Sequence, residues 1–379
     1  MRGSAGAEYF PSSWESACQS HRGGPRSAPP HGAGHASQAI THDAESALGS
    51  DDARDQAWHE CLFADGAFRR PSGGGTIGVR DKASGEIFAL AGLATEPDVD
   101  AAAAAAAAAQ REWSERTYAD RAGLLRAVAA ALGDRAKSFR ELIMRETGCI
   151  AGKADYEISA ATSELMEAAG LASRAVGEVL PSGHAGRFSL SERIPVGVVG
   201  VITPWNFPLV LGMRVIAPAL ALGNAVLLKP SPETPASGGL AIAELFAAVG
   251  APPGIFAVLP GDVEVGQRLV THPDVAMIHF TGSTQVGRQI ASEAGGLLKK
   301  VSLELGGNNA LIVLDDADIE QATMIGAWSS FHYQARPASR PGATSSSAAS
   351  PTPTWPAWPG GPTRSPSATR SPRTSASAR

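Results

Sequence analysis

The sequence predicts an α/β fold built on an open, mainly parallel sheet. Two observations support this prediction: short runs of continuous apolar residues recur along the chain, and segments with helical periodicity lie between most of them. Strands that are apolar throughout are typical of parallel sheets with both faces covered by helices. In such sheets a ligand sits at the carboxyl ends of the strands, so the residues there are the first candidates for function.

The expected elements follow in chain order. An alanine run, 101–109, continues to Trp113 as a strong helix former, and 121–145 keeps apolar residues at helical spacing. The expected strands are 196–202, 225–228, 255–259, 277–280, 301–305 and 310–314. The expected helices between them are 209–222, 236–249, 263–271 and 284–298.

The first two strand ends carry an amide and a lysine. Two prolines around Asn206, in Thr203-Pro204-Trp205-Asn206-Phe207-Pro208, predict a rigid loop after the first strand. The Asn206 amide could donate to a developing oxyanion, or close an Asx turn on its own backbone. Lys229, at the end of the second strand, could bind hydroxyl or phosphate groups of a nucleotide, or remain solvated.

Two later strand ends carry a helix cap and a carboxylate. Gly282 lets the backbone approach a ligand, and Ser283 or Thr284 caps the next helix, whose first N–H groups form an anion site. A Gly-Ser pair also marks an ordinary helix start. Glu304 ends its strand beside a glycine pair, where it could activate water or serve as a partnered structural acid.

Together these motifs resemble a known family. Pro-Trp-Asn-Phe-Pro, Lys-Pro-Ser, Phe-Thr-Gly-Ser-Thr and Leu-Glu-Leu-Gly-Gly, in this order at strand ends, closely resemble the NAD(P)-dependent aldehyde dehydrogenase superfamily from about Trp58 to Gln334. The residues around Met213-Arg214, 307–311 and 326–328 are most similar to the benzaldehyde or aromatic-aldehyde branch. The resemblance implies an aldehyde dehydrogenase-like fold with a Rossmann-type parallel sheet in the cofactor domain and a truncated catalytic domain.

The resemblance also implies a mechanism. In that family a cysteine thiolate attacks the aldehyde, and hydride transfer to the nicotinamide leaves a thioester. The resemblance implies that Asn206 stabilises the oxyanion and that Glu304 activates the hydrolytic water. Many NAD-specific members carry a carboxylate three residues after the lysine, but this chain has Pro232 there, so NAD or NADP is expected. The cofactor residues it assigns are Thr203, Pro204, Trp205, Lys229, Ser231, Gly261, Thr281, Gly282, Ser283, Val286 and Leu305.

The nucleophilic cysteine of the family is missing. Its expected position is Ala338, and Cys18, Cys61 and Cys149 lie in no comparable context, so they are interpreted as structural thiols. One inserted G after the codon of Gln334 can restore Gln-Gly-Gln-Thr-Cys-Ile, which indicates a frameshift. We therefore expect the chain as written to be inactive.

Composition divides the chain into parts. Residues 1–56 are expected to be a disordered or wrongly started leader, and 57–306 an NAD(P)-binding domain with an oligomerisation arm near 186–196. Residues 307–334 would begin a catalytic domain. Residues 335–379, with six Arg and no Asp, Glu, Val, Ile, Leu or Phe, are expected to be a disordered, out-of-frame tail.

Charge and cysteine usage exclude several classes. A net charge of −5 gives no basic excess for nucleic acid or a membrane surface, and no apolar run reaches the roughly 18 residues that a membrane span needs. Three scattered cysteines suggest neither a disulfide framework nor a zinc site, which favours a reduced, cytoplasmic protein.

Three function classes remain at this point. The first is an aldehyde dehydrogenase that oxidises an aromatic aldehyde such as benzaldehyde to its acid, with a family homo-oligomer impaired in this chain. The second is a pseudo-enzyme that only binds a dinucleotide. The third is an interaction protein that uses its Pro/Ser/Arg tail, which contains one bare P-x-x-P match at 353–356.

Overall fold

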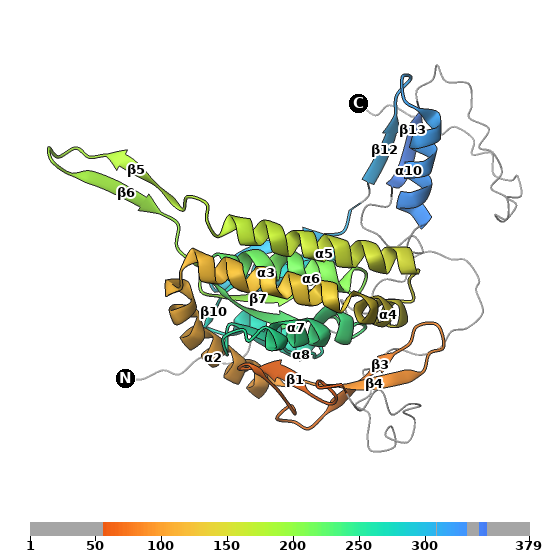
Figure 1. The fold of residues 1–379 in the computed structure, drawn as a ribbon, viewed down its shortest axis with the longest axis horizontal. Coiled ribbons are helices and arrows are strands. Elements are labelled where there is room, and N and C mark those ends of the chain that lie inside the picture. Colours follow the sequence, from red (N-terminus) through yellow and green to blue (C-terminus); the bar gives the residue numbers. More distant parts are fainter. Residues whose placement is uncertain (1–55, 308, 332–340, 347–379) are drawn as a thin grey trace, which may run out of the picture.

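A computed structural model describes residues 56–307, 309–331 and 341–346, and its centre is a seven-stranded sheet (Figure 1). The strands of this sheet are β1 (Leu62–Ala64), β2 (Ala67–Arg69), β7 (Val198–Ile202), β8 (Ala225–Lys229), β9 (Phe256–Val258), β10 (Val275–Gly282) and β11 (Lys300–Leu305). Their order is β11-β10-β7-β8-β9-β1-β2. The pairs from β11 to β9 are parallel, while β1 and β2 add an antiparallel edge.

Helices cover both faces of this sheet. The described helices are α2 (Glu96–Glu115), α3 (Tyr118–Asp134), α4 (Ala136–Thr147), α5 (Ala151–Leu171), α6 (Pro208–Ala221), a π-helical turn η3 (Ala236–Leu240), α7 (Ala241–Ala248), α8 (Val263–Thr271), α9 (Thr284–Gly296) and α10 (Ile319–Phe331). Val199 and Val201 of β7 join one core with α3, α5, α6 and α7, whereas Val198 joins a second core with α2, α8 and α9. Successive side chains of a strand point to opposite faces, so the two cores lie on opposite sides of the sheet.

Local signals start the first helices. Thr95 precedes α2, and its backbone N–H donates to Asp98 Oδ2 at 2.8 Å. Thr117 precedes α3, and its Oγ1 accepts from the backbone N–H of Asp120 at 3.2 Å. Each arrangement is a capping box, which satisfies N–H groups that lack a partner inside the helix.

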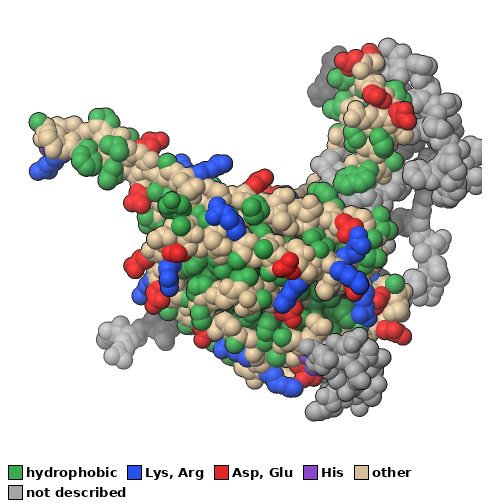
Figure 2. All heavy atoms as spheres, viewed as in Figure 1, with side chains coloured by type: hydrophobic (Ala, Val, Ile, Leu, Met, Phe, Trp, Pro, Cys, Tyr) green, Lys and Arg blue, Asp and Glu red, His purple; other side chains and the backbone are tan. Residues whose placement is uncertain are grey.

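Three two-stranded sheets lie outside the central one. β3 (Thr76–Arg80) pairs with β4 (Ile87–Gly92), β5 (Gly177–Pro181) with β6 (Phe188–Glu192), and β12 (Asn309–Val313) with β13 (Pro341–Ser346). The β5–β6 hairpin projects away from the body, and β12, α10 and β13 rise from the opposite end (Figure 1). Figure 2 shows apolar side chains along the projecting hairpin.

The predicted parallel sheet and its flanking helices are confirmed. Helix 263–271 has the predicted bounds, and the strands expected at 196–202, 225–228, 255–259, 277–280 and 301–305 all lie in the central sheet. The run 310–314 also forms a strand, but β12 leaves this sheet and pairs with β13.

Two expectations require correction. The continuous helix expected at 121–145 is broken at Arg135, whose φ of −102° and ψ of 12° follow Gly133, a residue of low helix propensity. Residues 341–346 of the expected disordered tail form β13, because an edge strand such as β12 offers backbone groups that pair without apolar side chains. The leader up to residue 55 and the other tail residues lie outside the described residues.

Candidate active site

The order of the central strands creates a topological switch point between β7 and β10. From β7 the chain continues to β8 and β9 on one side, whereas β10 and β11 extend the sheet on the other. Ligands of open α/β sheets bind outside the carboxyl ends of the strands at such a point. Ile202, Lys229 and Gly282 end β7, β8 and β10, and they mark the edge where a ligand is expected.

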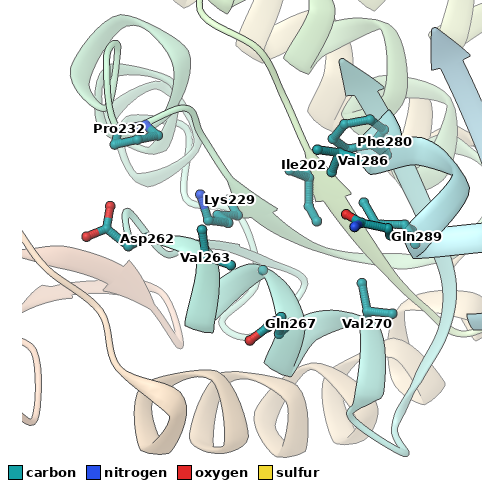
Figure 3. A pocket seen from close by; sticks show the side chains of 12 residues that line it. Ile202, Lys229, Pro232, Asp262, Val263, Gln267, Val270, Phe280, Val286 and Gln289 are labelled. Carbon is teal, nitrogen blue, oxygen red and sulfur yellow. The ribbon is translucent and has the colours of Figure 1, made fainter. Parts of the chain in front are cut away.

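A cavity of about 190 Å³ lies at this edge, beside α8 and α9 (Figure 3). Most of its wall is apolar, which suits the face of a flat ring. Lys229, Asp262 and Pro232 lie toward one side of the view, and Phe280, Val286 and Gln289 toward the other. The lining residues are Ile202, Lys229, Pro232, Asp262, Val263, Gly266, Gln267, Val270, Phe280, Val286, Gln289 and Ile290.

Lys229 is a buried cation in the wall of this cavity. Its side chain ends 3.5 Å from the carbonyl oxygen of Pro230, a long contact for a hydrogen bond. Burial lowers the pKa of Lys229 to about 8, although the nearby carboxylates of Asp262 and Glu264 oppose this shift. An ammonium group whose one hydrogen bond to the described residues is this long contact can donate to hydroxyl oxygens of a ligand.

Gln289 supplies an acceptor at the other end of the cavity. Among the described residues, its Oε1 is buried and has no hydrogen-bond partner. A buried acceptor without a partner costs about 1–3 kcal/mol, so a ligand N–H group that reaches it would be stabilised. The adenine ring offers both an apolar face and an exocyclic amino group, which matches this wall.

The start of α9 provides the predicted helix cap. Ser283 precedes the helix, and its Oγ accepts from the backbone N–H of Val286 at 3.3 Å. A Cβ at Gly282 would lie 2.4 Å from the ring of Phe280, and a Cβ at Gly287 would lie 2.4 Å from Leu305 Cδ2. A larger residue at either position would therefore have to displace the side chain of Phe280 or Leu305.

The Asn206 loop follows β7 and leads into α6. Asn206 Oδ1 accepts a hydrogen bond from the backbone N–H of Phe207 at 3.1 Å. The oxygen of the amide is therefore bound within the loop, and its NH₂ group is the end that can donate to a ligand. Thr203 N donates to Lys229 O at 3.2 Å, and Thr203 Oγ1 is buried without a partner among the described atoms. The loop thus begins beside the cavity and ends at the first turn of α6.

A fully buried ion pair holds the other end of this loop. Lys153 Nζ lies 2.6 Å from Glu157 Oε2, and both side chains are fully buried in α5. Glu157 Oε1 accepts from the backbone N–H groups of Leu209 at 2.7 Å and Val210 at 3.3 Å, at the start of α6. Burial raises the pKa of Glu157, while Lys153 and these N–H groups act in the opposite direction.

Aromatic contacts bring α10 to the same loop. The ring of Tyr156 lies 6.5 Å from the ring of Phe207 and 6.0 Å from that of Trp328, both edge-on. Lys153 Nζ also lies 4.6 Å from the centre of the Phe207 ring. Helix α10, which precedes the segment that contains Ala338, is therefore docked beside the Asn206 loop.

Glu304 lies on the same face of the sheet as α6. It is exposed and pairs in register with Thr281, while Leu303 and Leu305 join the core on the opposite face. His279 lies between Thr281 Oγ1 at 3.2 Å and Ser302 Oγ at 3.1 Å. Burial lowers the pKa of His279, and the charge of Glu304 opposes this shift.

The structure brings only part of the predicted cofactor set to the cavity wall. Lys229 and Val286 line it. The others lie in the segments after the strands: Thr203, Pro204 and Trp205 follow β7, Ser231 is buried in the turn after β8, Gly261 precedes α8, Thr281 and Gly282 end β10, Ser283 caps α9, and Leu305 ends β11. A Cβ at Gly261 would lie 2.4 Å from Val265 Cγ2, so a larger residue at position 261 would collide with the first turn of α8.

Several residues of the site were missed. Asp262 and Gln289 line the cavity, and Tyr156, Lys153 and Glu157 hold the Asn206 loop. The i, i+3, i+4 spacing of Val286, Gln289 and Ile290 could have indicated one helix face, but no local signal pairs α5 with α6 across more than fifty residues.

The remaining predictions concern thiols and metals. Cys149 is buried and Cys61 partly so, and burial raises the pKa of both thiols, as expected for structural cysteines. Cys18 and Ala338 lie outside the described residues. Within the described part of the chain, no cluster of His, Cys, Asp or Glu could hold a metal ion, and no helix is long and apolar enough to cross a bilayer.

Comparison with known proteins gives one consistent result. Residues 68–336 match the model of the aldehyde dehydrogenase family. Benzaldehyde dehydrogenase [NAD(+)] from Pseudomonas putida is 49% identical over 261 residues, which cover 69% of this chain and 54% of that protein. Vanillin dehydrogenase from Amycolatopsis is 47% identical over 280 residues, covering 74% of this chain and 57% of that protein.

Solved structures show the same similarity. An NAD-dependent benzaldehyde dehydrogenase from Corynebacterium glutamicum aligns with a TM-score of 0.70 and 37% identity, covering 74% of this chain and 61% of that one. A salicylaldehyde dehydrogenase from Pseudomonas putida G7, solved with salicylaldehyde, aligns with a TM-score of 0.69 and 35% identity over 72% and 57% of the two chains. The chain spans about half the length of the curated relatives that it matches.

Proposed function

The chain belongs to the aldehyde dehydrogenase family of NAD(P)-dependent oxidoreductases, and on this premise we propose that residues 57–306 form the cofactor domain of an aromatic-aldehyde dehydrogenase. The observation that carries the proposal is the cavity at the switch point, with buried Lys229 at one end and the unpartnered Oε1 of Gln289 at the other. The names of the benzaldehyde, vanillin and salicylaldehyde relatives support an aromatic substrate.

The residues of the cavity fit an adenine dinucleotide. Val286 and Ile290 offer apolar contact to a ring, Gln289 can accept from its amino group, and Lys229 can donate to a ribose hydroxyl. When bound, the nicotinamide end supplies a hydride acceptor. The N-terminal N–H groups of α9, after the Ser283 cap, can donate to the pyrophosphate.

Asn206 and Glu304 are proposed for the chemistry on the opposite face. With the cysteine of the family restored at position 338, the NH₂ end of Asn206 would donate to the oxyanion that forms when the thiolate adds to the aldehyde; losing such a donor costs on the order of 10²–10³ in rate. Glu304 is exposed, so its carboxylate can take a proton from the water that releases the acid.

The projecting hairpin is proposed as an oligomerisation arm. The side chains of Val179, Phe188 and Leu190 are 72%, 71% and 68% exposed on β5 and β6. Apolar groups so exposed on an isolated hairpin favour burial against a second copy of the chain. The arm begins at Gly177, earlier than the 186–196 expected from sequence, because β5 belongs to it.

A nucleotide titration of the full chain tests the cofactor site. We expect saturable binding of NAD⁺ or NADP⁺ by isothermal calorimetry, and its loss in Gly266→Leu. A Cβ at Gly266 would lie 3.6 Å from Lys229 Cδ and 3.9 Å from Ile202 Cδ1, so a larger side chain fills the cavity. Gly123→Leu is the matched control, because that helical glycine is exposed and a Cβ added there would meet no atom within 4 Å. Equal binding by both variants contradicts the assignment.

The alanine at position 338 supports a second candidate function, dinucleotide binding without catalysis. Position 338 is Ala where the family has its cysteine, so we propose that this chain binds the dinucleotide without oxidising an aldehyde. Sequencing the DNA that encodes His332 to Arg340 separates the two functions. One additional G restores a cysteine codon and the enzyme, whereas agreement with the protein sequence leaves a binding protein.

A further inference from the structure

A carboxylate without a partner lies in the cavity wall beside Lys229. Asp262 lines the cavity at the position before α8, immediately after Gly261 (Figure 3). Its side chain makes no capping hydrogen bond to α8, and no described residue forms an ion pair or hydrogen bond with it. The carboxylate is therefore available to a ligand in the cavity.

Charge around Lys229 is unbalanced toward the acidic side. Asp262 is the carboxylate that acts most strongly on Lys229, and Glu264 in the first turn of α8 is the second. The start of a helix normally attracts an anion, but here two carboxylates of the chain already supply negative charge at that end. A phosphate group beside Lys229 would therefore meet more repulsion than attraction.

The residues after Lys229 do not supply a carboxylate to the cavity wall. Position 232, where many NAD-specific members of the family have a carboxylate, is Pro232 in this chain. The next residue, Glu233, pairs instead with Lys82 at 2.5 Å. Asp262 is consequently the carboxylate that lines the cavity at the lysine end.

We infer that Asp262 makes this site selective for NAD⁺ over NADP⁺, by accepting a hydrogen bond from the ribose 2′-hydroxyl and repelling a 2′-phosphate. A carboxylate that binds the ribose hydroxyls is the general device for NAD⁺ in dinucleotide folds, and a 2′-phosphate adds nearly two negative charges at pH 7. The inference rests on the proposed cofactor site and replaces the expectation, drawn from Pro232 alone, that either cofactor fits.

Nucleotide binding by the full chain tests it. AMP and 2′,5′-ADP, which differ only in the 2′-phosphate, are titrated by calorimetry beside NAD⁺ and NADP⁺ at low and at moderate salt. We expect NAD⁺ and AMP to bind at least about tenfold tighter than their 2′-phosphorylated counterparts, with a smaller ratio at higher salt. Asp262→Asn should weaken NAD⁺ binding and reduce the ratio to about threefold or less.

A charge-matched control isolates the position. Glu264→Gln removes a charge of the same sign near the same helix start, but Glu264 is exposed and does not line the cavity, so the ratio should fall clearly less than in Asp262→Asn. Thermal melts check that both variants fold. Equal affinities for the two cofactors, tighter NADP⁺ binding, or an equal effect of Glu264→Gln overturns the inference. Absence of binding by all four nucleotides instead overturns the proposed cofactor site itself, and with it the inference.

Discussion

The two faces of the sheet differ in how completely the described chain builds them. On the α8–α9 face, β strands and two adjacent helices enclose a cavity with apolar walls and polar ends. On the α5–α6 face, Asn206 and Glu304 lie near the same sheet edge, but Glu304 is exposed, and α10 carries exposed Met324, Ile325 and Trp328. The residues of the binding cavity are therefore enclosed, whereas Asn206 is half-buried and Glu304 is exposed.

The difference teaches that binding and chemistry are separable in this molecule. The residues that line the cavity all lie between Ile202 and Ile290, in the parallel sheet and the helices beside it. The α5–α6 face depends in addition on α10, whose Trp328 contacts Tyr156. Changes on one face should thus leave the function of the other measurable.

The largest expected effect is on turnover. With Ala338 in place of a thiol, aldehyde oxidation by this chain should fall on the order of 10⁶-fold below that of a version translated with the restored Gln-Gly-Gln-Thr-Cys-Ile frame. NADH formation at 340 nm with benzaldehyde measures the rate, and calorimetry verifies that NAD⁺ still binds. Benzaldehyde oxidation by the chain as given would contradict the need for a thiol at position 338, and loss of NAD⁺ binding would show that the two faces are not separable.

The next effect concerns the buried pair that anchors the Asn206 loop. Glu157→Ala should lower the free energy of unfolding by about 3–5 kcal/mol, because it removes the carboxylate of a fully buried ion pair. Urea denaturation measures the change. Asp155→Ala is the matched control in the same helix: the Arg140–Asp155 pair is about half exposed, so we expect little or no change. Similar losses in both variants would refute the special role of burial.

Lys229 should give a pH-dependent effect. Its folded-state pKa is lowered to about 8 from 10.5, so between these values the unfolded chain retains a proton that the folded chain has lost. The free energy of unfolding therefore rises with pH from about 8 to 10.5, and the cost of the buried charge, at most about 3 kcal/mol, is fully present below pH 8.

Lys229→Met should remove that cost at pH 7 while weakening NAD⁺ binding about ten- to a hundredfold, since a charged hydrogen bond is lost. Urea denaturation from pH 6 to 10.5 gives the difference between the two proteins. Lys299, whose pKa is also lowered to about 8 by burial, remains in both and cancels. If the free energies of unfolding of Lys229→Met and of the unmodified chain changed with pH in the same way, the prediction would be wrong.

The smallest expected effect is at Gln289. Replacing it with Leu removes a buried oxygen without a partner, so the unliganded chain should gain about 1 kcal/mol. AMP should bind several-fold more weakly, because the acceptor for its amino group is gone. Arg288→Leu, on the exposed side of α9, serves as the control and should change neither quantity. Tighter AMP binding by Gln289→Leu would show that the adenine amino group does not bind at Gln289 Oε1.

Much of this fold could be predicted because its signals are local. Continuous apolar strands, the cap at Ser283 and the proline-flanked Asn206 loop each depend on a few adjacent residues, and the structure has the predicted sheet and helices. The Glu157 contact with Leu209 and the approach of Tyr156 to Trp328 join elements far apart in sequence, and no periodicity indicates them. Asp262 was missed because its role depends on its distance from Lys229 in space.

The projecting β5–β6 hairpin should also determine how the chain is cut by proteases. Its loop from Ser182 to Arg187 is exposed apart from partly buried Ser182, and among the described residues its strands pair only with each other. Within residues 56–307, trypsin should therefore cleave after Arg187 well before sites within α5 and α6. Because these two helices pack against each other, the fragments on either side of the cut should remain associated.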